Sequence, residues 1–167
     1  MEAGENRLDK IYELACESKY SIHDLSRCKS SAAGEYARMN MPFELGMDLG
    51  VRRAGNEQLS TKQFLIFEDQ PYETKRTLSD LGGQDIVWHK GDYQLVIKGL
   101  RDFLSVQVGV PGLPGATKLK ADYEDCSAWT VNKKMDEGHT EREALALPTA
   151  ERLAAMKEWI DAGKPAV

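Results

Sequence analysis

The residues Gln63-Phe64-Leu65-Ile66-Phe67 form an almost unbroken apolar run between polar segments. Such a run predicts a short strand that is buried on both faces, as strands are when helices cover a parallel sheet. Two further short segments, over 19–23 and 85–89, are also predicted to be strands. Helical patterns lie between the three segments, and this alternation predicts an α/β fold with helices on both faces of a parallel sheet.

Local start and stop signals place the helices. Asn6 is a suitable cap for a first helix, and Pro42 suits the first turn of a second helix that ends at Gly55-Asn56. A short helix begins at Pro71 and ends at Gly82-Gly83, and Asp92 caps another that runs to about 104. The first helix repeats apolar residues at helical spacing: Leu8, Ile11, Leu14 and Ala15.

The segment from Val110 to Gly115 contains two prolines and two glycines and predicts a linker. Two helices are expected beyond it, over about 119–137 and 149–162. The second has an apolar stripe formed by Leu153, Met156, Trp159 and Ile160. We therefore divide the chain into an α/β domain over 6–104 and a helical extension over 116–163, expected to be a hairpin that packs on the domain or on a partner.

Composition excludes several classes of protein. The net charge of −5 gives no basic footprint for nucleic acid, and no apolar run approaches the ~18–20 residues of a membrane helix. Cys16, Cys28 and Cys126 are widely spaced, which favours free thiols in a reducing compartment such as the cytoplasm. Neither the cysteines nor the histidines have the spacing of metal ligands, so we expect no metal site and no cofactor.

Two acidic residues mark the candidate site. Asp24 follows the first predicted strand, and Glu44 lies in the first turn of the next helix. Open α/β sheets bind ligands at the carboxyl ends of their strands, so we expect both carboxylates to face one crevice. The polar loop between them is long enough to suggest a functional role. Structural roles are open as well, because Asp24 could cap a turn and the helix dipole alone favours an acid such as Glu44.

Three segments resemble a known group of proteins: SKYSIHDLSR, RMNMPFELGMDLG and LSDLGGQDIVWH. They are similar to bacterial nucleotide-binding-like proteins related to Toll/interleukin-receptor (TIR) domains and nucleoside 2-deoxyribosyltransferases. The resemblance covers roughly residues 6–104 and implies a flavodoxin-like three-layer sandwich. It also implies that Glu44 corresponds to the glutamate that is catalytic in TIR NADases and is the nucleophile in the deoxyribosyltransferases.

The group usually begins with a further strand–helix–strand unit, whereas this chain starts at the segment matching Asn6–Lys10. A shortened gene product, a divergent member that has lost activity, and a pocket completed by another subunit are all open explanations. A three-stranded parallel sheet is also small for the burial that such sheets require. We therefore expect an edge or face of the sheet to expose apolar surface unless the C-terminal hairpin or a second subunit covers it.

The resemblance implies chemistry at an N-glycosidic bond. Its cleavage passes through a cationic sugar that a carboxylate stabilises or attacks, and this role falls to Glu44. Asp24 would hold ribose hydroxyls, Ser26 and Asn40 would bind the sugar or base, and Arg38 would pair with a phosphate. Asp85, beside Gly82-Gly83, would join the pocket rim, although two glycines beside polar groups also make an ordinary turn.

Two functions follow as expectations. The first is an enzyme that acts on a nucleoside or NAD glycosidic bond, and the second is a non-catalytic module that binds a nucleotide or a partner protein. The expected ligand in either case is a nucleotide or NAD-like small molecule. A homo-oligomer or a partner protein is a further expectation.

Overall fold

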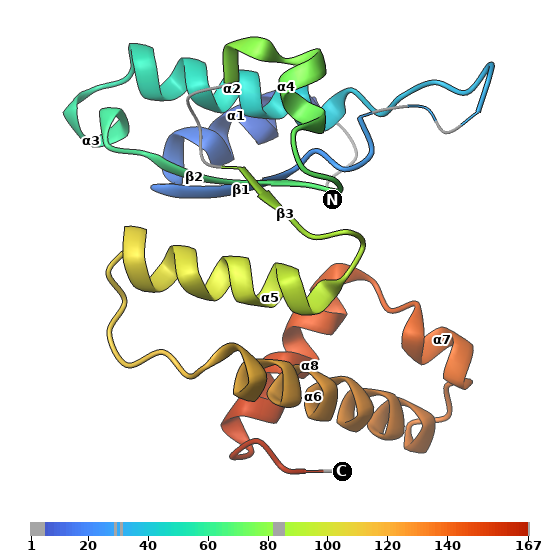
Figure 1. Ribbon diagram of the computed structural model, residues 1–167. Coiled ribbons are helices and arrows are strands. Elements are labelled where there is room, and N and C mark those ends of the chain that lie inside the picture. Colours follow the sequence, from blue (N-terminus) through green and yellow to red (C-terminus); the bar gives the residue numbers. More distant parts are fainter. Residues whose placement is uncertain (1–5, 29, 31, 82–85, 167) are drawn as a thin grey trace. The chain divides into compact units, whose positions relative to one another are not determined.

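The computed structural model describes residues 6–28, 30, 32–81 and 86–166, and the chain divides into two compact units, 1–111 and 112–167 (Figure 1). Asp85 of the predicted pocket rim lies outside the described residues. The elements of the first unit are α1 (Arg7–Glu17), β1 (Tyr20–Asp24), α2 (Asn40–Ala54), α3 (Glu57–Ser60), β2 (Gln63–Glu68), α4 (Glu73–Thr77), the 3₁₀ turn η1 (Ser79–Leu81), β3 (Ile86–Trp88), α5 (Tyr93–Asp102) and the π-helical turn η2 (Phe103–Gln107).

The three strands form one parallel sheet in the order β1-β2-β3. Ile22 of β1 lies opposite Leu65, and Phe67 of β2 lies opposite Val87. This arrangement confirms the predicted parallel neighbours and the α/β class. Every residue of β2 from Phe64 to Glu68 is buried, as the apolar run predicts for a central strand.

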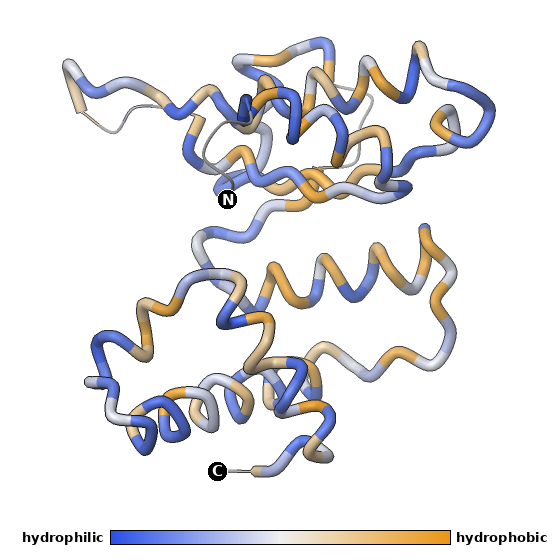
Figure 2. The backbone as a smooth tube through the Cα atoms, turned by 180° about the vertical axis from the view of Figure 1, so that it is seen from behind, coloured by the Kyte–Doolittle hydropathy of each residue, from blue (hydrophilic) through white to orange (hydrophobic). Residues whose placement is uncertain are grey.

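Alternating side chains of β2 build a core on each face of the sheet. Phe64 and Ile66 pack with Leu25 and with Leu45 of α2. Leu65 and Phe67 pack on the opposite face with Phe103, where α5 ends. Helices therefore cover both faces (Figure 1), and Figure 2 shows the hydrophobic residues of the strands between them.

The caps at Asn6 and Asp92 are confirmed, because their Oδ1 atoms accept hydrogen bonds from the N–H groups of Leu8 and Gln94 at 3.1 and 2.8 Å. The predicted first helix is present as α1, and its apolar residues are only partly covered. No residue of α1 is buried, and both Leu8 and Leu14 are exposed. The helix lies mainly against α2, whose neighbouring surface covers only part of that face.

A buried charged cluster fastens α1 to the rest of the first unit. Asp48 of α2 is only 2% exposed, and its Oδ1 lies 3.1 Å from Nζ of Lys62, whose side chain is fully buried. Nε2 of His23 lies 3.1 Å from the other carboxylate oxygen, which also accepts from Ser21. The Lys62 ammonium donates to the carbonyl of Ala15 at 2.7 Å and to that of Ser18, where α1 ends.

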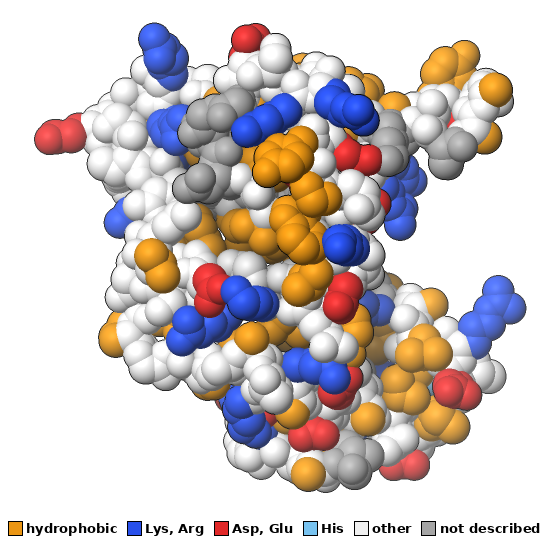
Figure 3. Space-filling model, viewed as in Figure 1, with side chains coloured by type: hydrophobic (Ala, Val, Ile, Leu, Met, Phe, Trp, Pro, Cys, Tyr) orange, Lys and Arg blue, Asp and Glu red, His pale blue; other side chains and the backbone are white. Residues whose placement is uncertain are grey.

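The β3 edge of the sheet leaves apolar surface uncovered within the first unit. Trp88 is exposed, and Figure 3 shows hydrophobic side chains gathered near β3. A shallow hollow of about 550 Å³ follows this edge, lined among others by Ile86, Val87, Trp88, Leu95, Phe103 and Val106. So small a sheet is expected to expose surface of this kind.

The second unit contains α6 (Ala116–Asp136), α7 (Glu141–Leu145) and α8 (Thr149–Asp161). The two predicted helices are present, and α7 is an addition with a capping box between Thr140 and Glu143. Of the predicted α8 stripe, Trp159 is buried together with Ala155, whereas Leu153, Met156 and Ile160 are exposed. Among the helices of the described ranges, none has both the length and the apolar composition needed to cross a bilayer.

Candidate functional site

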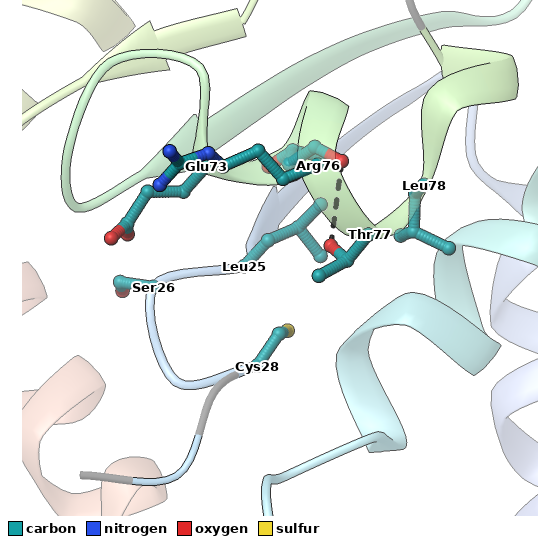
Figure 4. A pocket seen from close by; sticks show the side chains of 8 residues that line it. Leu25, Ser26, Cys28, Glu73, Arg76, Thr77 and Leu78 are labelled. Atoms are coloured by element: carbon teal, nitrogen blue, oxygen red, sulfur yellow. Dashed lines mark hydrogen bonds between the residues drawn. The ribbon is translucent and has the colours of Figure 1, made fainter.

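A cavity of about 180 Å³ opens where β1 and β2 end (Figure 4). The loop after β1 forms one wall with Leu25, Ser26 and Cys28, and α4 forms the other. The side chains from α4 are Glu73, Thr74, Arg76 and Thr77, followed by Leu78. Ligands of open α/β sheets bind at this end of the strands.

A buried carboxylate holds α4 in place as a wall of the cavity. Glu68 ends β2 and is only 4% exposed. Its Oε1 accepts the N–H of Tyr72 at 2.7 Å, and its Oε2 accepts the N–H of Thr74 at 2.9 Å. These bonds replace water around the charge and hold Tyr72 in the left-handed region, with φ of 68°.

The turn after β3 is fixed in a similar way. Lys90 also has a left-handed backbone, with φ of 52°. The N–H of His89 donates to the carbonyl of Glu68 at 3.0 Å, and that of Lys90 donates to Asp69 at 2.8 Å. Left-handed non-glycine residues cost about 1–3 kcal/mol each and persist only where neighbours enforce them, typically at functional sites. The strained turns after β2 and β3 therefore support a functional site at this end of the sheet.

Asp24 links the cavity wall to the turn after β3. Its Oδ1 accepts the N–H of Ser26 at 3.0 Å and also the Ser26 hydroxyl, and it lies 3.5 Å from Nε2 of His89. The N–H of Gly91 donates to Nδ1 of His89 at 3.0 Å, so the proton of the neutral imidazole is on Nε2 and faces Asp24.

These contacts keep Asp24 ionised. Burial raises the pKa of its carboxyl group, but the two hydrogen bonds from Ser26 and the contact with His89 lower it further, and the net pKa is below the ordinary value. The order of the groups is Ser26, Asp24, His89, with the carboxylate in the middle. A nucleophilic serine needs the imidazole beside its hydroxyl, so this arrangement positions a carboxylate instead of activating Ser26.

Glu44 and Asn40 lie in a different hollow from Ser26. This hollow, of about 500 Å³, is formed where α1 and α2 begin, and its lining includes Asn6, Arg7, Met39 and Phe43. Leu45 faces the sheet core, and each helical residue turns by about 100°, so the preceding Glu44 points toward α1.

The structure does not bring Asp24 and Glu44 to one crevice. Asp24 lies opposite Phe67, which faces α5, and the ring of His89 packs on Phe67 at 6.0 Å between centroids. Glu44 belongs to α2, which covers the other face of the sheet. The expectation of a shared crevice is therefore corrected to two separate places, one holding Asp24 and Ser26 and the other holding Asn40 and Glu44.

Arg38 is exposed and does not line the cavity. Its backbone N–H donates to the backbone carbonyl of Arg27 at 3.0 Å. The arginine that lines the cavity is Arg76 of α4, which shares the lining with the acidic Glu73 of the same helix (Figure 4). The sequence analysis did not identify Arg76 as a site residue. Its position in the first helix after the buried strand is the feature that could have indicated it. Positions of this kind lie at the carboxyl end of a parallel sheet.

The thiol of Cys28 faces the same cavity. Burial, and then the charge of Asp24, raise the pKa of this thiol above its ordinary value. A thiol that stays protonated is a poor nucleophile. All three cysteines are free, and within the described parts of the chain no three His, Cys, Asp or Glu side chains are grouped to hold a metal ion.

No protein-family model matches this sequence, and no curated protein and no solved structure is significantly similar to it.

Proposed function

We propose that residues 6–104 form a flavodoxin-like domain that binds a nucleotide or a related phosphorylated nucleoside in the cavity between the loop after β1 and α4. The observation that carries this proposal is that Arg76 lines one cavity with Ser26 and Thr77 at the carboxyl ends of the strands (Figure 4). A guanidinium can form two parallel hydrogen bonds to a phosphate.

Asp24 does not line the cavity itself, but it precedes Leu25 and Ser26 of the cavity wall and offers a further polar group for a sugar phosphate. Oδ2 of Asp24 accepts no hydrogen bond from a described residue, whereas Oδ1 is held by Ser26 and His89. A fixed carboxylate with one free oxygen can accept ribose hydroxyls. The cavity volume of about 180 Å³ is below the ~300–1,000 Å³ of drug-sized pockets. It therefore holds the phosphate or ribose part of the ligand and leaves the base at the surface.

Binding can be tested by calorimetric titration with ribose 5-phosphate, AMP and adenosine. Replacing Arg76→Met should weaken binding of both phosphorylated compounds by about 10- to 100-fold, the loss expected for charge-assisted hydrogen bonds of about 1.5–3 kcal/mol. The neighbouring Lys75→Met is the matched control, because Lys75 lies over the ring of Tyr72 and does not line the cavity. Equal affinity of the two variants would exclude the phosphate role of Arg76.

A second candidate function is cleavage of an N-glycosidic bond in NAD or a related nucleotide, with Glu44 at the anomeric carbon. The observation in its favour is that the half-buried Glu44 and the exposed Asn40 line one hollow of about 500 Å³, which is large enough for a nucleoside. The resemblance to TIR NADases and deoxyribosyltransferases supports the same residue. Under this proposal the ligand lies between α1 and α2.

The assay for cleavage is release of nicotinamide or free base by the purified protein. Glu44→Gln keeps the shape of the side chain and removes its charge, so turnover should fall by orders of magnitude while folding persists. Glu57→Gln on α3 is the control, because Glu57 is exposed and does not line this hollow. Turnover that is the same in Glu44→Gln and wild type would eliminate the catalytic role.

A further inference from the structure

The outer edge of β1 carries backbone groups without a partner among the described residues. The N–H of Leu25 donates to Phe67 at 2.8 Å, and the carbonyl of Lys19 accepts from Gln63 at 3.2 Å, so the odd-numbered residues direct their backbone groups toward β2. The N–H and C=O groups of Tyr20, Ile22 and Asp24 therefore point away from the sheet. An open edge of this kind is a template for another strand.

The side chains along this edge favour pairing. Ile22 is 50% exposed although it is a β-branched residue in the middle of a strand, and the Asp24 side chain is 54% exposed. Tyr20 is held edge-on against Phe103, with 6.3 Å between the ring centroids. The strand YSIHD contains neither proline nor lysine, two residues with which proteins commonly protect an edge.

We propose that β1 pairs antiparallel with β1 of a second copy of this chain, about a two-fold axis at Ile22. The two three-stranded sheets then form one six-stranded sheet. In this register Ile22 lies beside the partner's Ile22, and Tyr20 lies beside the partner's Asp24. Each outward-facing residue of β1 gains a hydrogen-bonded partner, and the exposed isoleucines cover each other.

Charge repulsion and the number of paired residues favour this register over two alternatives. An axis at Asp24 would place the two Asp24 carboxylates directly opposite each other, and like charges in that position are destabilising. An axis at Tyr20 would leave Asp24 beyond the paired residues and would separate the two copies of Ile22. Only the axis at Ile22 uses all three outward residues and keeps the carboxylates apart. Because five paired residues make a small interface, the dimer should dissociate on dilution.

Sedimentation velocity over a wide range of protein concentration tests the pairing. The wild type should shift toward the dimer as concentration rises, whereas Ile22→Pro should stay monomeric, because proline removes the outward N–H without removing a bond to β2. Ile22→Val and Leu14→Lys are controls that should still dimerise; Leu14 is exposed on α1, outside β1. Ile22→Lys replaces the proline variant if circular dichroism shows that the latter is unfolded.

Cross-linking tests the register. In a chain with Cys16 and Cys28 changed to serine and Cys126 to alanine, Ile22→Cys should oxidise to a disulfide-linked dimer, because the two Cα atoms would lie about 5.5 Å apart. Lys19→Cys should not, since six residues along the strands separate the two copies by about 20 Å. A wild type that stays monomeric, a dimer that survives Ile22→Pro and Ile22→Lys, or equal cross-linking at both positions would overturn the proposal.

Discussion

Replacing Asp48 with asparagine should destabilise the first unit strongly, because it leaves the Lys62 ammonium buried without a counter-ion. The side chain of Lys62 is fully buried, and the ion pair of 3.1 Å to Asp48 is the charged contact in its surroundings. Breaking a buried pair by removing one partner costs about 3–5 kcal/mol. We expect the lower end, about 3 kcal/mol, because the ammonium keeps the Ala15 and Ser18 carbonyls as acceptors.

A double-mutant cycle separates the charge from the packing. Lys62→Met should also destabilise, since Asp48 then loses its cation. The double variant Asp48→Asn/Lys62→Met has no unpaired charge, so its loss should be about 2 kcal/mol smaller than the sum of the single losses. Urea unfolding followed by circular dichroism gives the energies, and hydrogen exchange of β1 and β2 peptides assigns the loss to the first unit. Strictly additive losses would contradict this account.

The same pair predicts a pH dependence. Burial raises the pKa of Asp48, but hydrogen bonds from His23, Ser21 and Lys62 lower it further, to a net value below the ordinary one. A depressed folded-state pKa means that the stabilisation is complete above the unfolded pKa of about 3.9 and is lost as the pH falls through the folded value. The difference between wild type and Asp48→Asn should therefore be constant near neutral pH and shrink below about pH 4.

Four further substitutions test individual features. Gly99→Ala on α5 should cost about 1–3 kcal/mol, because its Cβ would lie 2.8 Å from Phe67, whereas Gly50→Ala on α2 meets open space and should stabilise by about 0.5–1 kcal/mol in thermal unfolding. Thr140→Ala should cost about 1 kcal/mol and speed hydrogen exchange in α7, because the capping box is lost. Glu68→Gln should speed exchange across α4, because an amide oxygen can accept only one of the two N–H groups now bound.

The presence of the three strands and several helix limits could be predicted because they depend on local signals. The apolar run of β2 identifies a strand that is buried on both faces without knowledge of its neighbours. The caps at Asn6 and Asp92 act within two residues, on the N–H groups of Leu8 and Gln94. Interactions between residues that are this close in the chain can be recognised from the sequence alone.

The use of each helix face could not be predicted, because it depends on which element packs there. Glu44 and Leu45 are neighbours in sequence, yet one points toward α1 and the other toward the sheet. For the same reason the sequence does not show which apolar residues of α8 are buried: Trp159 is buried while Leu153 is exposed. Asp48 and Lys62 look like ordinary polar positions in the sequence, and only the packing of α2 against the strands brings them together.

The attachment of α1 through Lys62 has a consequence for synthesis on the ribosome. The helix buries none of its own residues, and the carbonyls of Ala15 and Ser18 at its end are bound by a lysine 47 and 44 positions downstream. As the chain elongates, α1 is synthesised before Lys62 and before the strand β2. At that stage its leucines have no sheet to pack against. An isolated helix of 11 residues is marginal in water. The helix α1 is therefore fixed in place only after Lys62, the residue before β2, has been synthesised.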